Sequence, residues 1–294
     1  MPPRRLRRPT SWIQTVPELP EVETIRRDLD AEVAGRKIAR VEVTGARTVR
    51  RHRTRAAFVS KVEGRKLVKV DRLGKYLLLR LDSGDILVVH LGMSGQLLLD
   101  KKGKGPRPKH THVVLGFDRG TEVRFVDPRT FGELFVTTPG ELESEVPELA
   151  HLGFDPLSGV MSWQHFGQLL AARKRRLKEL LMNQKFLAGI GNIYSDEILW
   201  AAGLRYDRPS DSLSSQEVRR LYRSMVEVLQ DAIKHRGSSL ADEQYRDLFG
   251  EVGRFASRHQ VYDRAGERCR RCRHPISRIR FGSRSHFLCE QCQT

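Results

Sequence analysis

The chain has 294 residues and a formal net charge of +17 at pH 7. This length can bury a sizeable core and fits two domains. A charge so far from zero predicts a polyanionic partner, with nucleic acid as the leading candidate and an acidic lipid surface as the second. The charge is spread over both halves of the chain, and no apolar run is long enough to span a bilayer. Both observations argue against a membrane protein.

The stretch Pro17–Glu23 leads into a segment with helical periodicity. Pro20 favours the first turn of such a helix, and Gly35 favours its end. Pro17 and Glu18 therefore lie just ahead of a helix N-terminus. The plain interpretation is a helix start whose acidic residues complement the helix dipole. The apolar stripe of this helix consists of Val22, Ile25, Leu29 and Val33.

Residues 1–16 are rich in arginine and contain no apolar segment typical of a signal peptide. Val16 is the residue that a GUG start codon would give on translation. We therefore interpret residues 1–16 as an upstream extension that is absent from the mature protein. Synthesis from Val16, followed by removal of the initiator methionine, would leave Pro17 with a free secondary amine, which is a nucleophile.

Residues 37–136 read as short strands joined by turns that contain glycine and aspartate, with one helix, at the start. This pattern is typical of an antiparallel sandwich or barrel. The basic segment Lys101–Lys109 is expected to be an exposed loop. The predicted strands are Ile38–Val43, Leu67–Val70, Tyr76–Leu81, Ile86–Val89, His112–Phe117 and Glu122–Val126.

The second half is predicted to be helical, after an acidic linker near residues 138–157. The Gly-rich stretch Phe186–Asn192 separates two of its helices. Two helices around a tight glycine-containing connection are typical of DNA-binding units and equally of simple packing units. The predicted helices are Trp163–Ala172, Arg176–Met182, Ile193–Ala202 and Ser215–Lys234.

All four cysteines of the chain lie in its last 26 residues, in two CxxC pairs separated by sixteen residues. This spacing predicts a closed tetrahedral site for one structural Zn²⁺, with iron in the same cage as the alternative. The residues between the pairs should form a β-hairpin rich in arginine, which suits phosphate binding. The predicted ligands are Cys269, Cys272, Cys289 and Cys292.

Lys75 and two glycine-containing loops, His90–Gly95 and Asp127–Gly132, complete the candidate functional residues. Taken alone, Lys75 is a solvated lysine at a strand start. Met93 and Phe131 have two interpretations: they cap the ends of the sandwich, or they insert into a duplex whose base has left the stack.

The chain resembles formamidopyrimidine-DNA glycosylases, with six motifs in the right order from Pro17 to the C-terminus. The motifs are Pro17–Glu23, Gly74–Tyr76, His90–Gly95, Asp127–Gly132, Gly189–Tyr194 and the four-cysteine ribbon. The resemblance implies an α+β multidomain fold and DNA bound in the cleft between the domains. We expect an antiparallel β-sandwich with an N-terminal helix in residues 17–137, a linker in 138–157, a helix-two-turn-helix domain in 158–258 and a zinc ribbon in 259–294.

The resemblance also implies an activity: excision of 8-oxoguanine and formamidopyrimidines from duplex DNA, followed by β,δ-elimination at the abasic site. Pro17 is implied to be the nucleophile and Glu18 the acid/base, and Lys75 is implied to contact a phosphate in the catalytic site. Further implied phosphate contacts are Asn192, Arg284 and His110. Met93, Arg129 and Phe131 are implied to fill the void left by the flipped base, with Arg129 facing the estranged cytosine.

The chemistry of an α-amino group supports the role of Pro17. Its reference pKa is about 7.7–8.0 against about 10.4 for lysine, so a much larger neutral fraction exists near pH 7. Attack on the sugar C1′ gives an iminium ion that cannot lose its charge by deprotonation at nitrogen. This chemistry uses no organic cofactor and no catalytic metal. The expected form is a monomer in the bacterial cytoplasm, associated with the nucleoid.

The chain departs from the family pattern at three places besides residues 1–16. Arg273 and Asp263 stand where glycine is usual, and Asp242–Arg254 differs from the loop that covers a flipped base. Two alternative functions remain open from the sequence. An endonuclease VIII-type enzyme for oxidised pyrimidines usually has glycine at the position of Leu19. A non-catalytic protein that binds damaged DNA is favoured by residues 1–16, which would block the amine.

Overall fold

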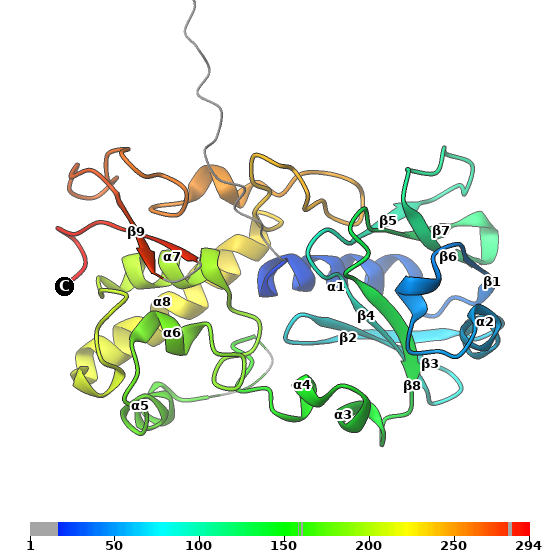
Figure 1. The fold of residues 1–294 in the computed structure, drawn as a ribbon, viewed down its shortest axis with the longest axis horizontal. Helices are drawn as coiled ribbons and strands as arrows, with labels where there is room; N and C mark the ends of the chain where they lie inside the picture. The colour runs from blue at the N-terminus through cyan, green and yellow to red at the C-terminus, as the bar shows by residue number, and fades with distance from the viewer. Residues whose placement is uncertain (1–16, 158, 160, 282–283) are drawn as a thin grey trace, which may run out of the picture.

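The computed structural model describes residues 17–157, 159, 161–281 and 284–294. In this part of the chain a strand-rich half and a helical half lie side by side (Figure 1). Helix α1 (Leu19–Val33) starts between the two halves and runs along the strand-rich one. None of the described helices is long and apolar enough to cross a membrane.

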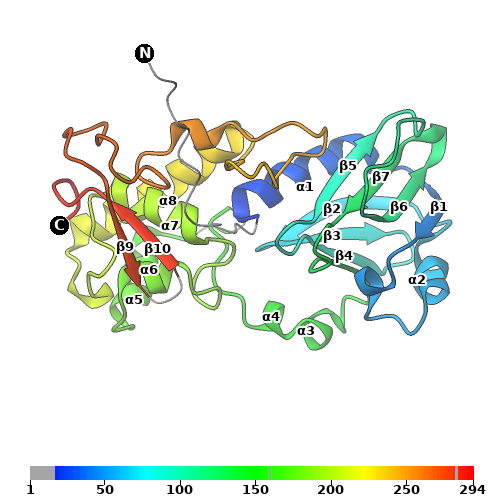
Figure 2. The ribbon, with the colours of Figure 1, turned by 45° about the horizontal axis from the view of Figure 1, so that its top comes forward.

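Two four-stranded antiparallel sheets form the strand-rich half, and they confirm the antiparallel sandwich that the sequence predicted. Their strand orders are β1-β6-β7-β5 and β2-β3-β4-β8, and Figure 2 shows them stacked. The strands are β1 (Ile38–Val43), β2 (Leu67–Leu73), β3 (Tyr76–Leu81), β4 (Ile86–His90), β5 (Gln96–Asp100), β6 (Thr111–Phe117), β7 (Glu122–Val126) and β8 (Glu133–Thr137).

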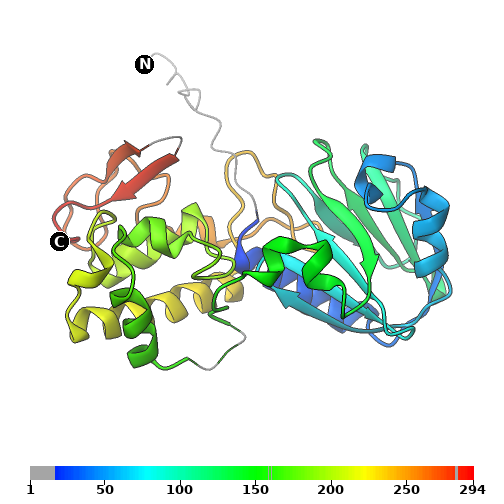
Figure 3. The ribbon, with the colours of Figure 1, turned by 60° about the horizontal axis from the view of Figure 1, so that its bottom comes forward.

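Strand alternation decides which side chains enter the core between the sheets. Leu77 and Leu79 of β3 belong to this core, whereas Leu78 belongs to a second apolar cluster. Two short helices cover that second cluster, α3 (Leu142–Glu145) and α4 (Pro147–Ala150), and Figure 3 shows them between the halves. The segment expected to be a linker therefore packs against the sandwich.

The expectation of one helix in the sandwich half was wrong, because α2 (Arg55–Val62) is a second one. The Thr54 hydroxyl accepts the N–H of Ala57 at 3.1 Å and caps its start. Phe58 and Val62 are its two buried side chains. Two apolar anchors are too few to produce a recognisable helical period. Strands β5 and β8 were also not predicted, since each is short and follows a glycine-containing loop.

The helical half forms a separate core, and the helices predicted from periodicity are present within one residue at each end. A capping box, in which Ser214 and Glu217 satisfy each other's main-chain N–H groups, fixes the start of the longest helix. The elements are α5 (Trp163–Ala171), α6 (Leu177–Leu181), α7 (Asn192–Ala202), α8 (Ser215–Lys234) and the hairpin of β9 (Ser277–Phe281) and β10 (Arg284–Leu288).

The segment after α8 crosses back to the sandwich, where it meets β5 (Figure 2). Leu248 is fully buried in the sandwich core, and its carbonyl accepts the N–H of Leu99 at 2.7 Å. Arg236 forms ion pairs with Asp28 on α1 and with Asp247 in the segment. The segment that the resemblance matched to a base-covering loop is therefore fastened to the other half of the molecule.

We expect Leu248→Ala to lower the free energy of unfolding by about 2–5 kcal/mol, because it leaves a cavity in the sandwich core. The neighbouring Phe249 is 43% exposed, so Phe249→Ala is the matched control and should cost less than about 1 kcal/mol. Urea denaturation followed by circular dichroism measures both. Equal effects of the two substitutions would contradict the docking of Leu248.

Candidate active site

Glu18 directly precedes helix α1, as the sequence predicted, and its side chain is buried. Its carboxylate accepts three main-chain N–H groups at the start of α7. The donors are Gly191 at 2.8 Å, Ile193 at 2.9 Å and Tyr194 at 3.3 Å. A helix N-terminus favours a negative charge, so this position holds the carboxylate in one place.

Two glycines allow α1 and α7 to approach so closely. A Cβ on Gly191 would lie 2.5 Å from the carboxyl carbon of Glu18, and one on Gly189 would lie 2.6 Å from Cβ of Leu19. Gly189 also has φ +88° and accepts the N–H of Leu19 at 3.0 Å. The Gly-rich stretch whose role the sequence left open is therefore a point of close contact between the two halves.

Lys75 lies on the turn between β2 and β3, and buried ion pairs hold this turn. The guanidinium of Arg72 donates to Asp155 at 2.5 and 3.1 Å and to the carbonyl of Gly74 at 3.0 Å. It also pairs with Glu23 on α1 at 3.0 Å. Since Asp155 lies near the end of the connecting segment, Arg72 links this segment, α1 and the turn that carries Lys75.

One pocket of about 400 Å³ brings together four of the residues singled out in the sequence: Glu18, Lys75, Asn192 and Arg284. Pro17, which precedes Glu18 in the chain, is buried and does not line this pocket. The pocket is also lined by residues that the sequence analysis did not single out, among them Tyr76, His90 and Tyr262. The first two belong to motifs that it quoted, whereas Tyr262 stands in no motif that marked it.

In this pocket, burial shifts the pKa values of an acid and of a base in the directions that favour their uncharged forms. Burial raises the pKa of Glu18, although the Lys75 ammonium and the three N–H donors oppose this shift. Burial also lowers the pKa of Lys75, opposed by the carboxylates of Glu18 and Glu21 and supported by Arg284. A carboxyl that keeps its proton to higher pH thus lies near an amine that loses its proton more readily.

Met93, Arg129 and Phe131 lie outside this pocket, on two neighbouring loops. A Cβ on Gly92 would lie 2.6 Å from the nitrogen of Gly132, so the loops touch. The guanidinium of Arg129 lies over the Phe131 ring, 5.0 Å from its centroid. Phe131 is 44% exposed, whereas Met93 is partly buried. An exposed aromatic ring is not a core cap, so the structure disfavours that interpretation for Phe131.

The fully buried carboxylate of Asp127 joins these two loops. One oxygen accepts the hydroxyl of Ser94 at 2.5 Å and the N–H of Arg129 at 3.2 Å, and the other accepts the N–H of Gly132 at 2.8 Å. A single side chain therefore sets the relative position of the loops that carry Met93 and Phe131.

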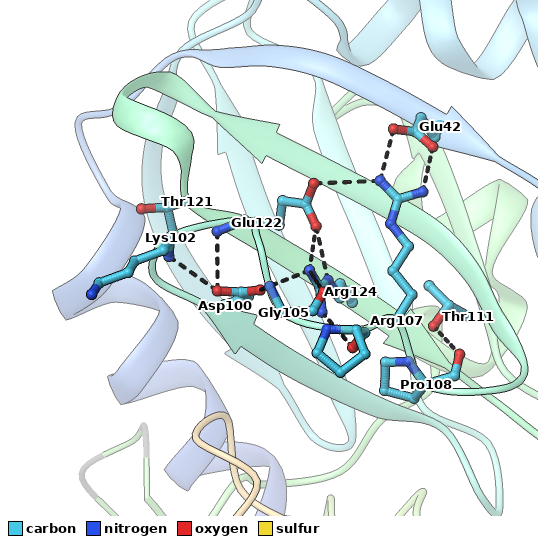
Figure 4. A network of polar contacts seen from close by, with 12 residues as sticks. Glu42, Asp100, Lys102, Gly105, Arg107, Pro108, Thr111, Thr121, Glu122 and Arg124 are labelled. Carbon is cyan, nitrogen blue, oxygen red and sulfur yellow. Dashed lines mark hydrogen bonds and ion pairs between the residues drawn. The ribbon is translucent and has the colours of Figure 1, made fainter.

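The basic segment Lys101–Lys109 lies across the face of the β1-β6-β7-β5 sheet, held by the network in Figure 4. The carboxylate of Asp100 accepts N–H groups of Lys102 at 3.0 Å and Gly105 at 2.7 Å. The guanidinium of Arg124 donates to Asp100 at 2.8 Å and to the carbonyl of Gly105 at 3.1 Å. The expected loop is thus fixed along its length.

His110 follows this segment and has a φ of 66°. It lines a cavity of about 270 Å³ with Arg107 and His112, separate from the pocket that contains Glu18. The structure therefore does not bring His110 together with Lys75 and Arg284.

The four cysteine sulfurs lie within 4.8 Å of one another at the base of the β9–β10 hairpin. The Sγ atoms of Cys269 and Cys292 are 3.9 Å apart, and those of Cys272 and Cys289 are 3.3 Å apart. Tetrahedral zinc with Zn–S bonds of about 2.3 Å places thiolates about 3.8 Å apart. The donor set and its spacing fit one structural Zn²⁺, and its four protein ligands leave no open position.

The expected start of the protein at Val16 concerns residues 1–16, which lie outside the described residues.

Comparison with known proteins identifies the family of the chain. Residues 16–134 match the formamidopyrimidine-DNA glycosylase N-terminal domain, residues 152–244 the H2TH domain of the same enzymes, and residues 266–294 a zinc finger found in FPG and IleRS. A formamidopyrimidine-DNA glycosylase of Salinispora arenicola is 46% identical over 95% of this chain and 96% of its own length.

Solved structures agree with this result. The MutM (FPG) protein of Thermus thermophilus is 41% identical, with a TM-score of 0.82 over 94% of this chain and 98% of its own. The Fpg of Lactococcus lactis, solved with DNA containing an abasic site, is 31% identical, with a TM-score of 0.84 over 94% of this chain and 99% of its own. The chain belongs to the formamidopyrimidine-DNA glycosylase family.

Proposed function

We propose that the protein is a base-excision repair enzyme, both a DNA glycosylase and an AP lyase, acting on duplex DNA with oxidised purines or abasic sites. The observation that carries this proposal is the buried Glu18 carboxyl at the start of α7, in one pocket with Lys75, Asn192 and Arg284. Relatives solved with DNA containing Fapy-dG or carbocyclic 8-oxo-G support these lesions as substrates.

Pro17 is proposed as the nucleophile, in a mature chain that begins with this residue. Its amine attacks C1′ of the damaged nucleotide, the glycosidic bond breaks and the base leaves. The amine nitrogen loses its proton, and the bond from C1′ to the ring oxygen breaks as that oxygen is protonated. The iminium ion formed in this way withdraws electrons from the sugar. Loss of a 2′ proton then expels the 3′ phosphate, and a second elimination expels the 5′ phosphate. Residues 1–16 would convert the amine to an amide, so the active form must lack them.

Glu18 is proposed as the acid/base. Burial raises its pKa, so a larger fraction holds a proton near pH 7 than for an exposed glutamate. This proton can go to the sugar ring oxygen as the ring opens, and the carboxylate can then accept the proton lost from C2′. The three N–H groups of α7 stabilise the charged form between these steps.

The remaining site residues are proposed to hold DNA. Lys75, Arg284 and Asn192 line the pocket and provide a positive charge or an amide for phosphates at the lesion. His110 is proposed as a phosphate contact farther away, consistent with its place in another cavity. Met93 and Phe131 are proposed to occupy the space left by the flipped base, with Arg129 facing the estranged cytosine.

One structural Zn²⁺, held by the four cysteines, is the only cofactor that we assign. When bound, it holds the ribbon hairpin together and so fixes Arg284 at the start of β10. No proton or electron transfer passes through it. We further propose that the protein acts as a monomer on the bacterial chromosome in the cytoplasm.

The lesion preference is tested with duplexes that carry one lesion opposite cytosine or adenine. We expect the form that begins at Pro17 to cut an 8-oxoguanine:cytosine duplex faster than one with thymine glycol. Faster cleavage of thymine glycol would favour the endonuclease VIII-type function. A protein that binds but neither cuts the DNA nor is trapped on it by borohydride would instead be a damaged-DNA-binding protein.

The role of the amine is tested at the N-terminus. We expect Pro17→Gly to retain slow lyase activity, because a primary α-amine has a similar pKa but forms a less persistent cation. One added residue before Pro17 should abolish borohydride trapping and leave affinity for an uncleavable abasic-site analogue within about twofold. The two variants form a matched pair, and undiminished trapping of the blocked form would overturn the assignment.

The role of the ribbon is tested by removing its metal. We expect Cys289→Ala, or chelation, to weaken DNA binding at least about tenfold, because the hairpin that carries Arg284 loses its anchor. Gln291→Ala changes an exposed residue of the same knuckle and is the control. Fluorescence anisotropy with labelled duplex measures affinity. Unchanged binding by metal-free protein would show that the ribbon does not position DNA ligands.

A further inference from the structure

A chain of buried side-chain hydrogen bonds leads from the first turn of α1 to the ribbon. The Tyr194 hydroxyl donates to Oε1 of Glu21 at 2.5 Å. The same hydroxyl lies 3.1 Å from Oγ of Ser238, which lies 3.0 Å from Nε2 of His259. Four residues from four separate parts of the sequence are thus connected without a gap.

These four residues are shielded from solvent along the whole path, since none exposes more than 4% of its surface. The N–H of Glu18 donates to Oε2 of Glu21 at 2.9 Å, so one end of the path touches the proposed acid/base. The N–H of Ser238 donates to Oε1 of Glu21 at 2.7 Å. This bond keeps the carboxyl where the same oxygen can accept the Tyr194 hydroxyl.

The other end of the path reaches a second cavity, of about 300 Å³, which His259 lines. Its lining includes the exposed residues Ser257 and Glu267, so the cavity opens to solvent. Tyr262 lines both this cavity and the pocket that contains Glu18, and therefore lies between them. The second cavity is thus a separate opening, on the other side of Tyr262 from the proposed DNA site.

The two ends of the path are titratable groups whose pKa values burial shifts in opposite directions. Burial and the adjacent Glu18 raise the pKa of Glu21 to about 7. Lys75 and Tyr245 also face Glu21. Burial lowers the pKa of His259, while the nearby Glu197 carboxylate opposes this shift.

Two further charged groups face His259, namely Asp263 and Arg264. Burial raises the pKa of Tyr194 well above its usual value, so its hydroxyl stays a neutral donor. The path therefore has a titratable group at each end and two neutral hydroxyls between them.

We propose that His259, Ser238, Tyr194 and Glu21 form a proton relay that connects the active-site end of α1 with solvent in the second cavity. The proposal rests on the glycosylase/lyase function given above. His259 and Ser238 are then positioning residues, because they act on the reaction through Glu21 and Glu18 without touching DNA.

Transfer along the relay balances at every atom. His259 takes a proton from solvent at Nδ1 and releases the proton of Nε2 to Oγ of Ser238. The hydroxyl proton of Ser238 moves to the oxygen of Tyr194, and the hydroxyl proton of Tyr194 moves to Oε1 of Glu21. His259 and both hydroxyls end neutral, and Glu21 ends protonated. The reverse sequence returns a proton to solvent.

Such a route has a use once DNA is bound. A duplex over the first pocket separates Glu18 from bulk water, while the ring opening and the two eliminations each require a proton to move. An ionised Glu21 favours the protonated form of Glu18, and a neutral Glu21 favours its release. Proton exchange through the second cavity therefore changes the charge of Glu21, and with it the proton affinity of the neighbouring Glu18 carboxyl, without release of DNA.

The test uses the form that begins at Pro17 and measures single-turnover scission of an abasic-site duplex. We expect His259→Ala to slow scission about tenfold, less than the 10²–10⁴ typical of a group that transfers a proton to the substrate directly. Affinity for the duplex should not change. The control is His235→Ala, because His235 also flanks the ring of Phe255 but does not reach Ser238.

Small-molecule rescue separates proton transfer from packing. Imidazole should restore scission by His259→Ala, whereas thiazole, which has the same shape and is far less basic, should not. Ser238→Ala interrupts the relay in the middle, so it should slow scission to a similar degree and gain nothing from imidazole. A normal rate for folded His259→Ala, or equal rescue by both compounds, would overturn the relay. Absence of scission by the unsubstituted protein would overturn the proposed function, and the relay with it.

Discussion

The contact on which the active site depends is the burial of the Glu18 carboxylate against the first N–H groups of α7. An ionised carboxyl without partners would be strongly disfavoured at this depth, so its position is stable only when α1 and α7 meet. Glu18 comes from the sandwich half and its donors come from the helical half. The docking of the two halves and the placement of the buried Glu18 carboxyl are therefore the same event.

Other polar contacts across the same boundary restrict how the halves can move. Arg72 links the turn that carries Lys75 with α1 and with Asp155, and Arg236 links α1 with the segment that inserts Leu248 into the sandwich core. Each guanidinium contacts two carboxylates at once, which fixes orientation as well as distance. The turn that carries Lys75 is thus held in place by ion pairs within the protein itself, which is the kind of preorganisation that electrostatic catalysis requires.

Two carboxyls at the start of one helix, Glu18 and Glu21, have different surroundings and therefore suit different tasks. Glu18 faces the pocket and accepts only main-chain donors, whereas Glu21 faces away from it and accepts the hydroxyl of Tyr194. Neighbouring acids disfavour simultaneous ionisation, so the charge of one influences the proton held by the other. Placing the second acid in a closed hydrogen-bonded path protects it from the DNA while keeping it coupled to the first.

The sequence by itself determined six of the eight sandwich strands, the long helices, the four-cysteine site and the motif residues of the pocket, because each depends on local periodicity or fixed spacing. Only the tertiary structure decided the partners of Glu18, the docking of Leu248, the separate place of His110 and the path from Glu21 to His259. Those features join residues up to 238 positions apart, as Glu21 and His259 are, and no local pattern encodes such a distance. They arise from the close approach of two halves, which glycines at 189 and 191 permit.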